Sequence, residues 1–190
     1  MGSDFTVIYD ACVLYPAPLR DLLMQLALSD LYRARWTDEI HQEWMRNVLK
    51  NRPDIIQRQL TRTKDLMNRS VRDCLVTGYE WIIPSLNLPD LDDRHVLAAA
   101  IQGQADVIVT FNLKDFPNSI LNKYEIEAQH PDLFIAYLID LYPLQIANAA
   151  ETCRKRLKNF PKSIDEYLVI LQKQGLTVTT SLLKKIIFGS

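Results

Sequence analysis

The feature that most constrains this chain is an apolar helix that leads, within a few residues, into a buried strand. Asp90–Ala100 reads Asp-Leu-Asp-Asp-Arg-His-Val-Leu-Ala-Ala-Ala, and Val107–Thr110 reads Val-Ile-Val-Thr. The second run has the composition of a strand that is covered on both faces. Phe5–Tyr9 is a similar β-rich run near the start of the chain. Strands that alternate with helices favour an α/β fold with a central, mostly parallel sheet flanked by helices.

The spacing of apolar residues predicts helices along most of the remaining chain. Thr37 is placed to cap one of them, with Ile40, Trp44 and Val48 toward the core. A short strand is predicted at Tyr79–Ile83. The three tryptophans, Trp36, Trp44 and Trp81, are predicted to be core residues rather than a surface for stacking bases. The predicted helices lie at Leu19–Ala27, Thr37 to before Pro53, Ile55–Leu75, Asp93–Gln102, Pro131–Leu141, Glu151–Asn159 and Asp165–Lys173.

Composition indicates an ordinary globular protein. The 190 residues are 48% hydrophobic, which suits one domain of residues 1–143 with a helical extension of residues 144–190. Three cysteines without metal-binding spacing favour a reducing, cytoplasmic setting, and no stretch is long enough to span a membrane. The net charge is −1, but residues 145–190 carry eight Lys/Arg against three Asp/Glu. This basic tail is either a candidate phosphate contact or a solvated helix face.

Acidic residues gather where strands end and helices begin. Asp10 follows the first strand, Asp90, Asp92 and Asp93 precede an apolar helix, and Asp115 follows the second strand. The carboxyl ends of parallel strands share one edge of a sheet, so these groups are expected to meet. Two carboxylates about 5 Å apart repel by roughly 3 kcal/mol at an effective dielectric near 20. A hard cation such as Mg²⁺ or Mn²⁺ would relieve that repulsion.

Each of these residues also has a structural explanation when it is taken alone. Asp10 suits a turn, and Asp92 or Asp93 suits a helix N-cap, although one acid is enough for a cap. Glu39 suits the positive first turn of its helix, whereas Glu43 lies deeper, between Ile40 and Trp44. His95 is predicted to pack or cap rather than to bind metal. The nucleotide-binding glycine motifs and the G-x-S-x-G motif of acyl hydrolases are absent from the sequence.

Taken together, these segments resemble the PIN-domain ribonucleases, and most closely the bacterial branch that includes VapC-type toxins. The resemblance covers roughly residues 5–140 and is most specific at Asp-Asp-Arg-His-Val-Leu-Ala-Ala-Ala and Val-Thr-Phe-Asn-Leu-Lys-Asp-Phe. It implies a three-layer PIN-like fold. It also implies that four acids bind metal and act in catalysis, with Asp92 as a rival to Asp93. The four are Asp10, Glu43, Asp93 and Asp115, and the possible accessory residues are Thr110, Asn112, Asp90 and Arg94.

The resemblance implies a Mg²⁺- or Mn²⁺-dependent endoribonuclease that cuts single-stranded RNA. A VapC-type protein would be the toxin of a bacterial type II toxin–antitoxin pair, with a cognate antitoxin and a homodimeric state. Candidate phosphate contacts are Arg94, Lys114, Arg154, Lys155, Arg156 and Lys158. One alternative is a non-catalytic PIN-like module that binds RNA or protein. Another is a phosphotransfer or phosphohydrolase domain with Asp10 as nucleophile, which Cys12 disfavours because that chemistry needs a second Asp there.

Overall fold

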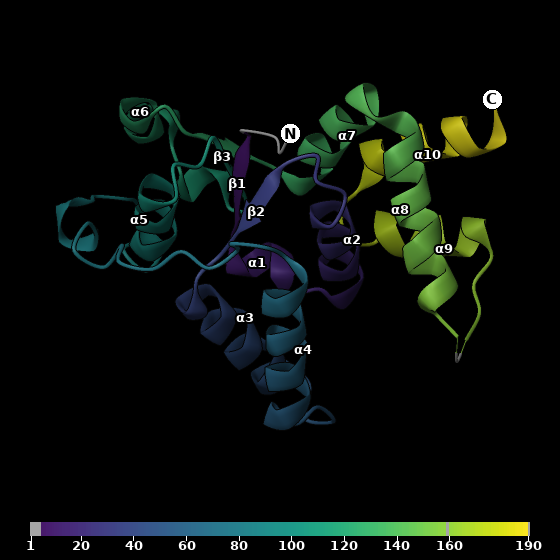
Figure 1. Cartoon of the computed structure of the whole chain (residues 1–190), viewed down its shortest axis with the longest axis horizontal. Helices are drawn as coiled ribbons and strands as arrows, with labels where there is room; N and C mark the ends of the chain where they lie inside the picture. The colour runs from purple at the N-terminus through teal and green to yellow at the C-terminus, as the bar shows by residue number, and fades with distance from the viewer. Residues whose placement is uncertain (1–4, 159, 190) are drawn as a thin grey trace.

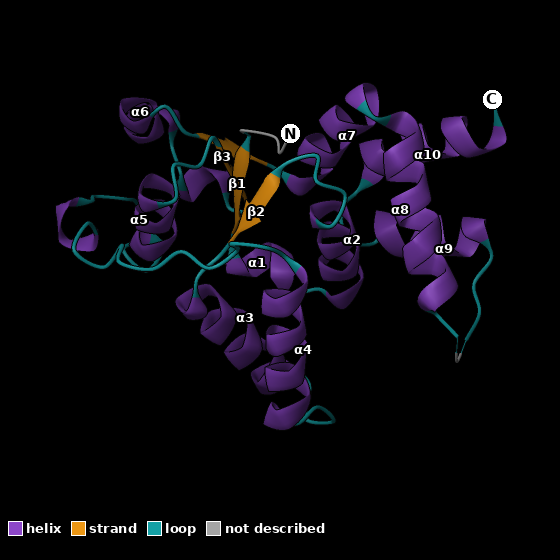
Figure 2. Cartoon of the chain, viewed as in Figure 1, coloured by secondary structure: helices purple, strands orange, loops and turns teal. Residues whose placement is uncertain are grey.

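The computed structural model describes residues 5–158 and 160–189, and its centre is a four-stranded parallel sheet. The strand order is β2-β1-β3-β4, so the first strand lies inside the sheet and pairs with strands that come later in the chain. Val7 aligns with Val107 of β3, and Thr6 aligns with Arg33 of β2. Helices lie to both sides of the sheet (Figure 2). The predicted α/β architecture, a central parallel sheet flanked by helices with a helical C-terminal region, is confirmed.

The bounds of the elements place most helices where the sequence predicts them (Figure 1). Pro131–Leu141 agrees at both ends, and Thr37 caps the helix that follows it by accepting a hydrogen bond from the Ile40 amide at 3.0 Å. The first half of the chain holds β1 Thr6–Tyr9, α1 Ala11–Leu14, α2 Ala17–Ala27, β2 Arg33–Arg35, α3 Asp38–Asn51, α4 Gln57–Ser70, η1 Ile83–Ser85 and α5 Arg94–Gln102. The second half holds β3 Val107–Val109, η2 Leu113–Asp115, α6 Asn118–Leu121, η3 Asn122–Tyr124, β4 Glu127–Gln129, α7 Pro131–Leu141, α8 Pro143–Arg156, α9 Ile164–Gln172 and α10 Thr177–Phe188.

Two predictions around residue 80 are wrong. Tyr79–Ile83 is not a strand but a series of turns that leads into η1. Its buried side chains, Tyr79 and Ile82, are three residues apart, which is the spacing of a tight turn and not of a strand. Trp81 lies between them and is 75% exposed, whereas Trp36 and Trp44 are fully buried. The three tryptophans therefore do not all belong to the core.

A buried polar network joins α3 to α4 beneath the sheet. The indole N–H of Trp44 donates to Nδ1 of His41 at 3.0 Å, so Nε2 carries the ring hydrogen and donates to Oδ1 of Asn68 at 2.9 Å. The indole N–H of Trp36 donates to the same Asn68 oxygen at 2.8 Å. Burial lowers the pKa of His41 to about 4. The ring is therefore neutral, with both nitrogen atoms satisfied by hydrogen bonds.

The C-terminal helices are tied to the sheet domain through α7. The carboxylate of Asp132 accepts hydrogen bonds from the Val178 and Thr179 amides, at 2.9 and 2.8 Å, and so satisfies the first turn of α10. The predicted tail helix at Glu151–Asn159 begins earlier than expected, at Pro143, and ends at Arg156, and Asn159 lies outside the described residues. No helix within the described ranges is both long and apolar enough to cross a membrane.

Candidate active site

The site is built where β1 and β3 end side by side. Asp10 directly follows β1, and its amide donates to the carbonyl of Val109 at 3.1 Å. Thr110 directly follows β3. Both strands are buried along their whole length, and Asp10 and Thr110 are the first residues after them, so both lie at the carboxyl edge of the sheet. Asp10 and Thr110 are nearly or completely buried there.

The carboxylate of Asp10 is held by two donors. The Thr110 hydroxyl donates to Oδ2 at 2.6 Å, and the Cys12 thiol donates to the same oxygen at 3.1 Å. Thr110 in turn accepts from the Asn112 amide at 2.9 Å, and Cys12 accepts from the Phe111 amide at 3.3 Å. Burial raises the pKa of Asp10, and the hydrogen bonds from Thr110 and Cys12 oppose that rise. One carboxylate oxygen is thus fixed in place, which orients the other.

Glu43 reaches the site from α3, and a histidine from α5 contacts it. Nε2 of His95 lies 3.2 Å from Oε2 of Glu43, and Nδ1 lies 3.9 Å from Oε2 of Glu39. The Tyr79 hydroxyl donates to that Glu39 oxygen at 3.0 Å. Burial lowers the pKa of His95, but the Glu43 contact and the two glutamate charges outweigh burial, so the pKa lies above its ordinary value. His95 is a packed residue as predicted, and it also links α5 to the acids of α3.

The structure distinguishes Asp93 from its neighbour Asp92. Oδ2 of Asp93 is buried without a hydrogen-bond partner, whereas Asp92 is exposed and its amide donates to Oδ1 of Asp90 at 2.9 Å. Burial raises the pKa of Asp93 to about 7, and the charges of Asp10, Asp90, Asp115 and Glu43 add to that rise. These acids therefore share one electrostatic environment.

The remaining predicted residues lie at the rim. Asp115 ends η2 and is half-buried, and Asn112 is exposed. The backbone amide of Asn112 donates to Thr110, and its side chain makes no hydrogen bond within the described residues. Nε of Arg94 donates to the Leu91 carbonyl at 2.9 Å, which fixes the turn before α5. Lys114 is exposed on η2.

The donor chemistry fits a hard divalent cation, because the converging groups are carboxylates and one hydroxyl. Asp93 has a buried oxygen without a partner, and burial, followed by the charges of the neighbouring acids, raises the pKa of its carboxyl, so a bound cation would stabilise its charged form. Within residues 5–158 and 160–189, however, no three His, Cys, Asp or Glu side chains are arranged so that they could hold a metal ion as they stand. The acids therefore share one electrostatic environment without forming a closed set of metal ligands within the described residues.

Sequence reasoning missed three contributors to this site. From the sequence, Cys12 only disfavours another enzyme class, Glu39 suits the helix dipole, and Tyr79 is predicted to lie in a strand. The spacing of Glu39 and Glu43, one helical turn apart, was an available signal that both could face the same neighbour. No sequence signal identified Tyr79 as a partner of Glu39, because the two are joined only by the tertiary fold.

Basic residues of the tail form ion pairs away from the carboxylate site. Arg154 and Lys155 both contact Glu151, and Arg156 contacts Asp21 of α2 at 3.6 Å. In Figure 1, α8 and α9 lie on the opposite side of the sheet from α5. Three of the four tail residues predicted to meet phosphates therefore have acidic partners of their own, away from the carboxylate site.

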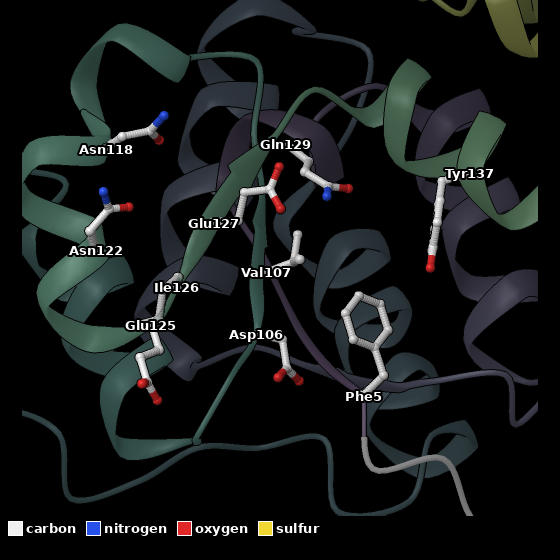
Figure 3. A pocket seen from close by; sticks show the side chains of 10 residues that line it. All are labelled: Phe5, Asp106, Val107, Asn118, Asn122, Glu125, Ile126, Glu127, Gln129 and Tyr137. Carbon is white, nitrogen blue, oxygen red and sulfur yellow. The ribbon is translucent and has the colours of Figure 1, made fainter.

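A separate open pocket of about 670 Å³ lies over β3 and β4 and contains none of the predicted site residues (Figure 3). Its lining includes Phe5, Tyr137 and the carboxylate of Asp106. That carboxylate accepts a hydrogen bond from the Thr6 amide at 2.7 Å, which gives it a structural role at the start of β1. The pocket therefore takes no part in the site at the carboxyl edge.

Comparison with known proteins matches two parts of the chain. The PIN domain model matches residues 6–114, more than half of the chain, and a model described as the VapC50 C-terminal domain matches residues 131–185. Over 65 residues the chain is 51% identical to a protein named "Putative ribonuclease VapC50" from Mycobacterium tuberculosis (strain ATCC 25618 / H37Rv). That alignment covers 34% of this chain and 38% of the relative.

Proposed function

Because the chain belongs to the PIN-domain family, in its VapC branch, we propose that it is a metal-dependent endoribonuclease that hydrolyses phosphodiester bonds in RNA. The observation that carries this proposal is the group of acids at the carboxyl edge of the sheet. Its centre is Asp93, whose buried oxygen has no hydrogen-bond partner. The relative that is 51% identical over 65 residues carries a ribonuclease name, which supports the same activity.

In this proposal Asp10, Glu43, Asp93 and Asp115 hold Mg²⁺ or Mn²⁺. A bound ion of this kind lowers the pKa of a coordinated water and stabilises the charge that develops on the phosphate. Thr110 holds Asp10 in one orientation through its 2.6 Å hydrogen bond. Asp93 must lose its proton before it can act as a ligand, and at a pKa of about 7 that loss occurs near neutral pH.

His95 and Cys12 have positioning roles in this scheme. His95 contacts Glu43 at 3.2 Å and so fixes the rotamer of an acid that reaches in from α3. The thiol of Cys12 donates to Asp10, and burial raises the pKa of that thiol, so it stays protonated and acts as a hydrogen-bond donor. The side chains around the acids are thus fixed by hydrogen bonds, which reduces the reorganisation needed during reaction.

We further propose the biological setting that the VapC branch suggests: a toxin paired with a cognate antitoxin, a homodimeric state, and a cytoplasmic location. The three cysteines are all free thiols, which suits a reducing compartment. The division into a nuclease domain of residues 1–143 and a helical extension of residues 144–190 stays a prediction. The family model for the C-terminal region begins earlier, at residue 131.

The test is RNA cleavage by the purified protein with Mg²⁺ or Mn²⁺, compared with EDTA. Asp93→Asn should abolish cleavage, while Asp92→Asn, which changes an exposed neighbour, should retain most of it. Asp10→Asn should also be inactive. Cleavage that persists in EDTA or in Asp93→Asn would overturn the assignment. A protein that binds RNA but never cuts it under any metal condition would be the non-catalytic PIN-like module.

A further inference from the structure

Trp81 is an exposed aromatic residue that the proposed chemistry leaves unexplained. Its side chain is 75% exposed, whereas the other two tryptophans of the chain, Trp36 and Trp44, are fully buried in the same protein. An indole ring that remains in water forgoes a large amount of apolar burial. We infer that Trp81 is a stacking platform for a base of the single-stranded RNA substrate, and this inference rests on the proposed ribonuclease function.

The first argument is position. Trp81 follows Tyr79 by two residues, a span of at most about 7 Å of chain. The hydroxyl of Tyr79 donates to Glu39 at 3.0 Å, and Glu39 lies one helical turn from Glu43. Figure 1 shows the segment between α4 and α5 running along the edge at which β1 and β2 end. Trp81 therefore lies two residues from a side chain that contacts a glutamate of α3, on the connection that follows this edge of the sheet.

The second argument is rigidity. The segment that carries Trp81 is anchored on both sides, since Tyr79 and Ile82 are 5% and 6% exposed. The amide of Ile82 donates to the carbonyl of Tyr79 at 2.9 Å, which closes the turn around Trp81. The following η1 packs against α5. An aromatic ring on a fixed backbone loses little conformational freedom when a ligand stacks on it.

The third argument is charge. Trp81 is preceded by the exposed Glu80, and the exposed Asp90 and Asp92 lie at the far end of the same connection. Carboxylates of this kind repel phosphates but not the face of a base. A base–indole contact is therefore better suited to this surface than a phosphate contact. Stacking of this kind tolerates any base, because every base offers a π-face.

The test uses the full chain and a fluorescein-labelled single-stranded oligo(A) RNA, with EDTA present so that no cleavage occurs. Trp81→Ala should weaken binding roughly 5- to 150-fold, the range that stacking contacts show on alanine substitution. The factor should be similar at low and high salt, because stacking releases no counterions. Trp81→Phe should retain part of the affinity. Phe160→Ala is the matched control, since Phe160 is 79% exposed in the connection between α8 and α9, and it should bind like the unmodified protein.

Tryptophan fluorescence gives an independent readout. With Trp36 and Trp44 buried, a change in emission on addition of the oligonucleotide should come from Trp81 and should disappear in Trp81→Phe. Unchanged RNA affinity and cleavage in Trp81→Ala would overturn this inference and leave the ribonuclease proposal standing. A loss of self-association with unchanged RNA affinity would instead make Trp81 a protein contact. An unmodified protein that neither binds nor cuts RNA would overturn both proposals.

Discussion

Replacing Asp93 by asparagine should make the metal-free protein more stable while it removes activity. The rise of the Asp93 pKa from 3.8 to about 7 corresponds to roughly 4 kcal/mol of preference for the uncharged form, since a tenfold change is about 1.4 kcal/mol. Asp93 is only half-buried, so solvent screening reduces the recoverable part to about 1–2 kcal/mol. For a chain of this size that amounts to a rise in Tm of roughly 2–8 °C.

The sign of the effect depends on pH. Below about pH 4 the carboxyl is protonated in both the folded and the unfolded states, so Asp93→Asn should change stability little. Between about 4 and 7 the unfolded chain releases the proton first, and the stability of the unmodified protein falls as pH rises. Above about pH 7 the folded protein carries the full cost of burying the charged Asp93 carboxylate, together with the repulsion from the neighbouring acids. The gain from Asp93→Asn should therefore be largest near pH 8.

Thermal or urea unfolding in EDTA at pH 5 and pH 8 measures this difference. Asp92→Asn is the matched control, because Asp92 is exposed and its substitution should change stability by less than about 0.5 kcal/mol. A destabilised Asp93→Asn protein at pH 8, or an equal gain in Asp92→Asn, would refute the electrostatic reasoning. RNA cleavage by the same two variants then shows whether Asp93, whose charge destabilises the folded protein, is also required for cleavage.

Three further outcomes follow from the described contacts. Mg²⁺ should raise the Tm, measured by scanning fluorimetry, more at pH 8 than at pH 6, because at pH 6 the metal must displace the proton of Asp93. Equal rises at both pH values would contradict this expectation. Asn68→Leu should cost about 2–4 kcal/mol in urea unfolding, because the buried donors of Trp36 and His41 both lose their acceptor, and a loss under 1 kcal/mol would argue against the network. Asp132→Ala should cost about 0.5–2 kcal/mol and speed amide exchange in the first turn of α10, whereas unchanged exchange would show that the cap is not needed.

The sequence predicted an element correctly where its run of apolar residues is typical of one kind of secondary structure. The apolar runs that became β1 and β3 are buried on both faces, so they could be recognised without a partner in view. Asp10 could then be placed at the end of a strand. β2 could not be found in this way, because Arg33-Ala34-Arg35 is an edge strand of three residues with one apolar side chain. β4, Glu127–Gln129, carries the same weak signal at the other edge.

The choices among site residues required tertiary contacts. Asp92 and Asp93 are adjacent acids with equal claims in the sequence, and only the packing of the turn before α5 leaves one oxygen buried and the other side chain exposed. Trp81 could not be recognised as a surface residue, because Tyr79–Ile83 is uniformly apolar apart from Glu80. Periodicity alone cannot distinguish a strand from a packed turn over so few residues.

The position of β1 inside the sheet has a consequence for how the protein is made. β1 is synthesised before its neighbours β2 and β3 and before the acid Asp115. A growing chain therefore has no complete set of acids until Asp115 has been synthesised. Because the acids meet only after β1 and β3 have paired, their repulsion is expected to act mainly on the lifetime of the folded protein and little on the rate at which it folds.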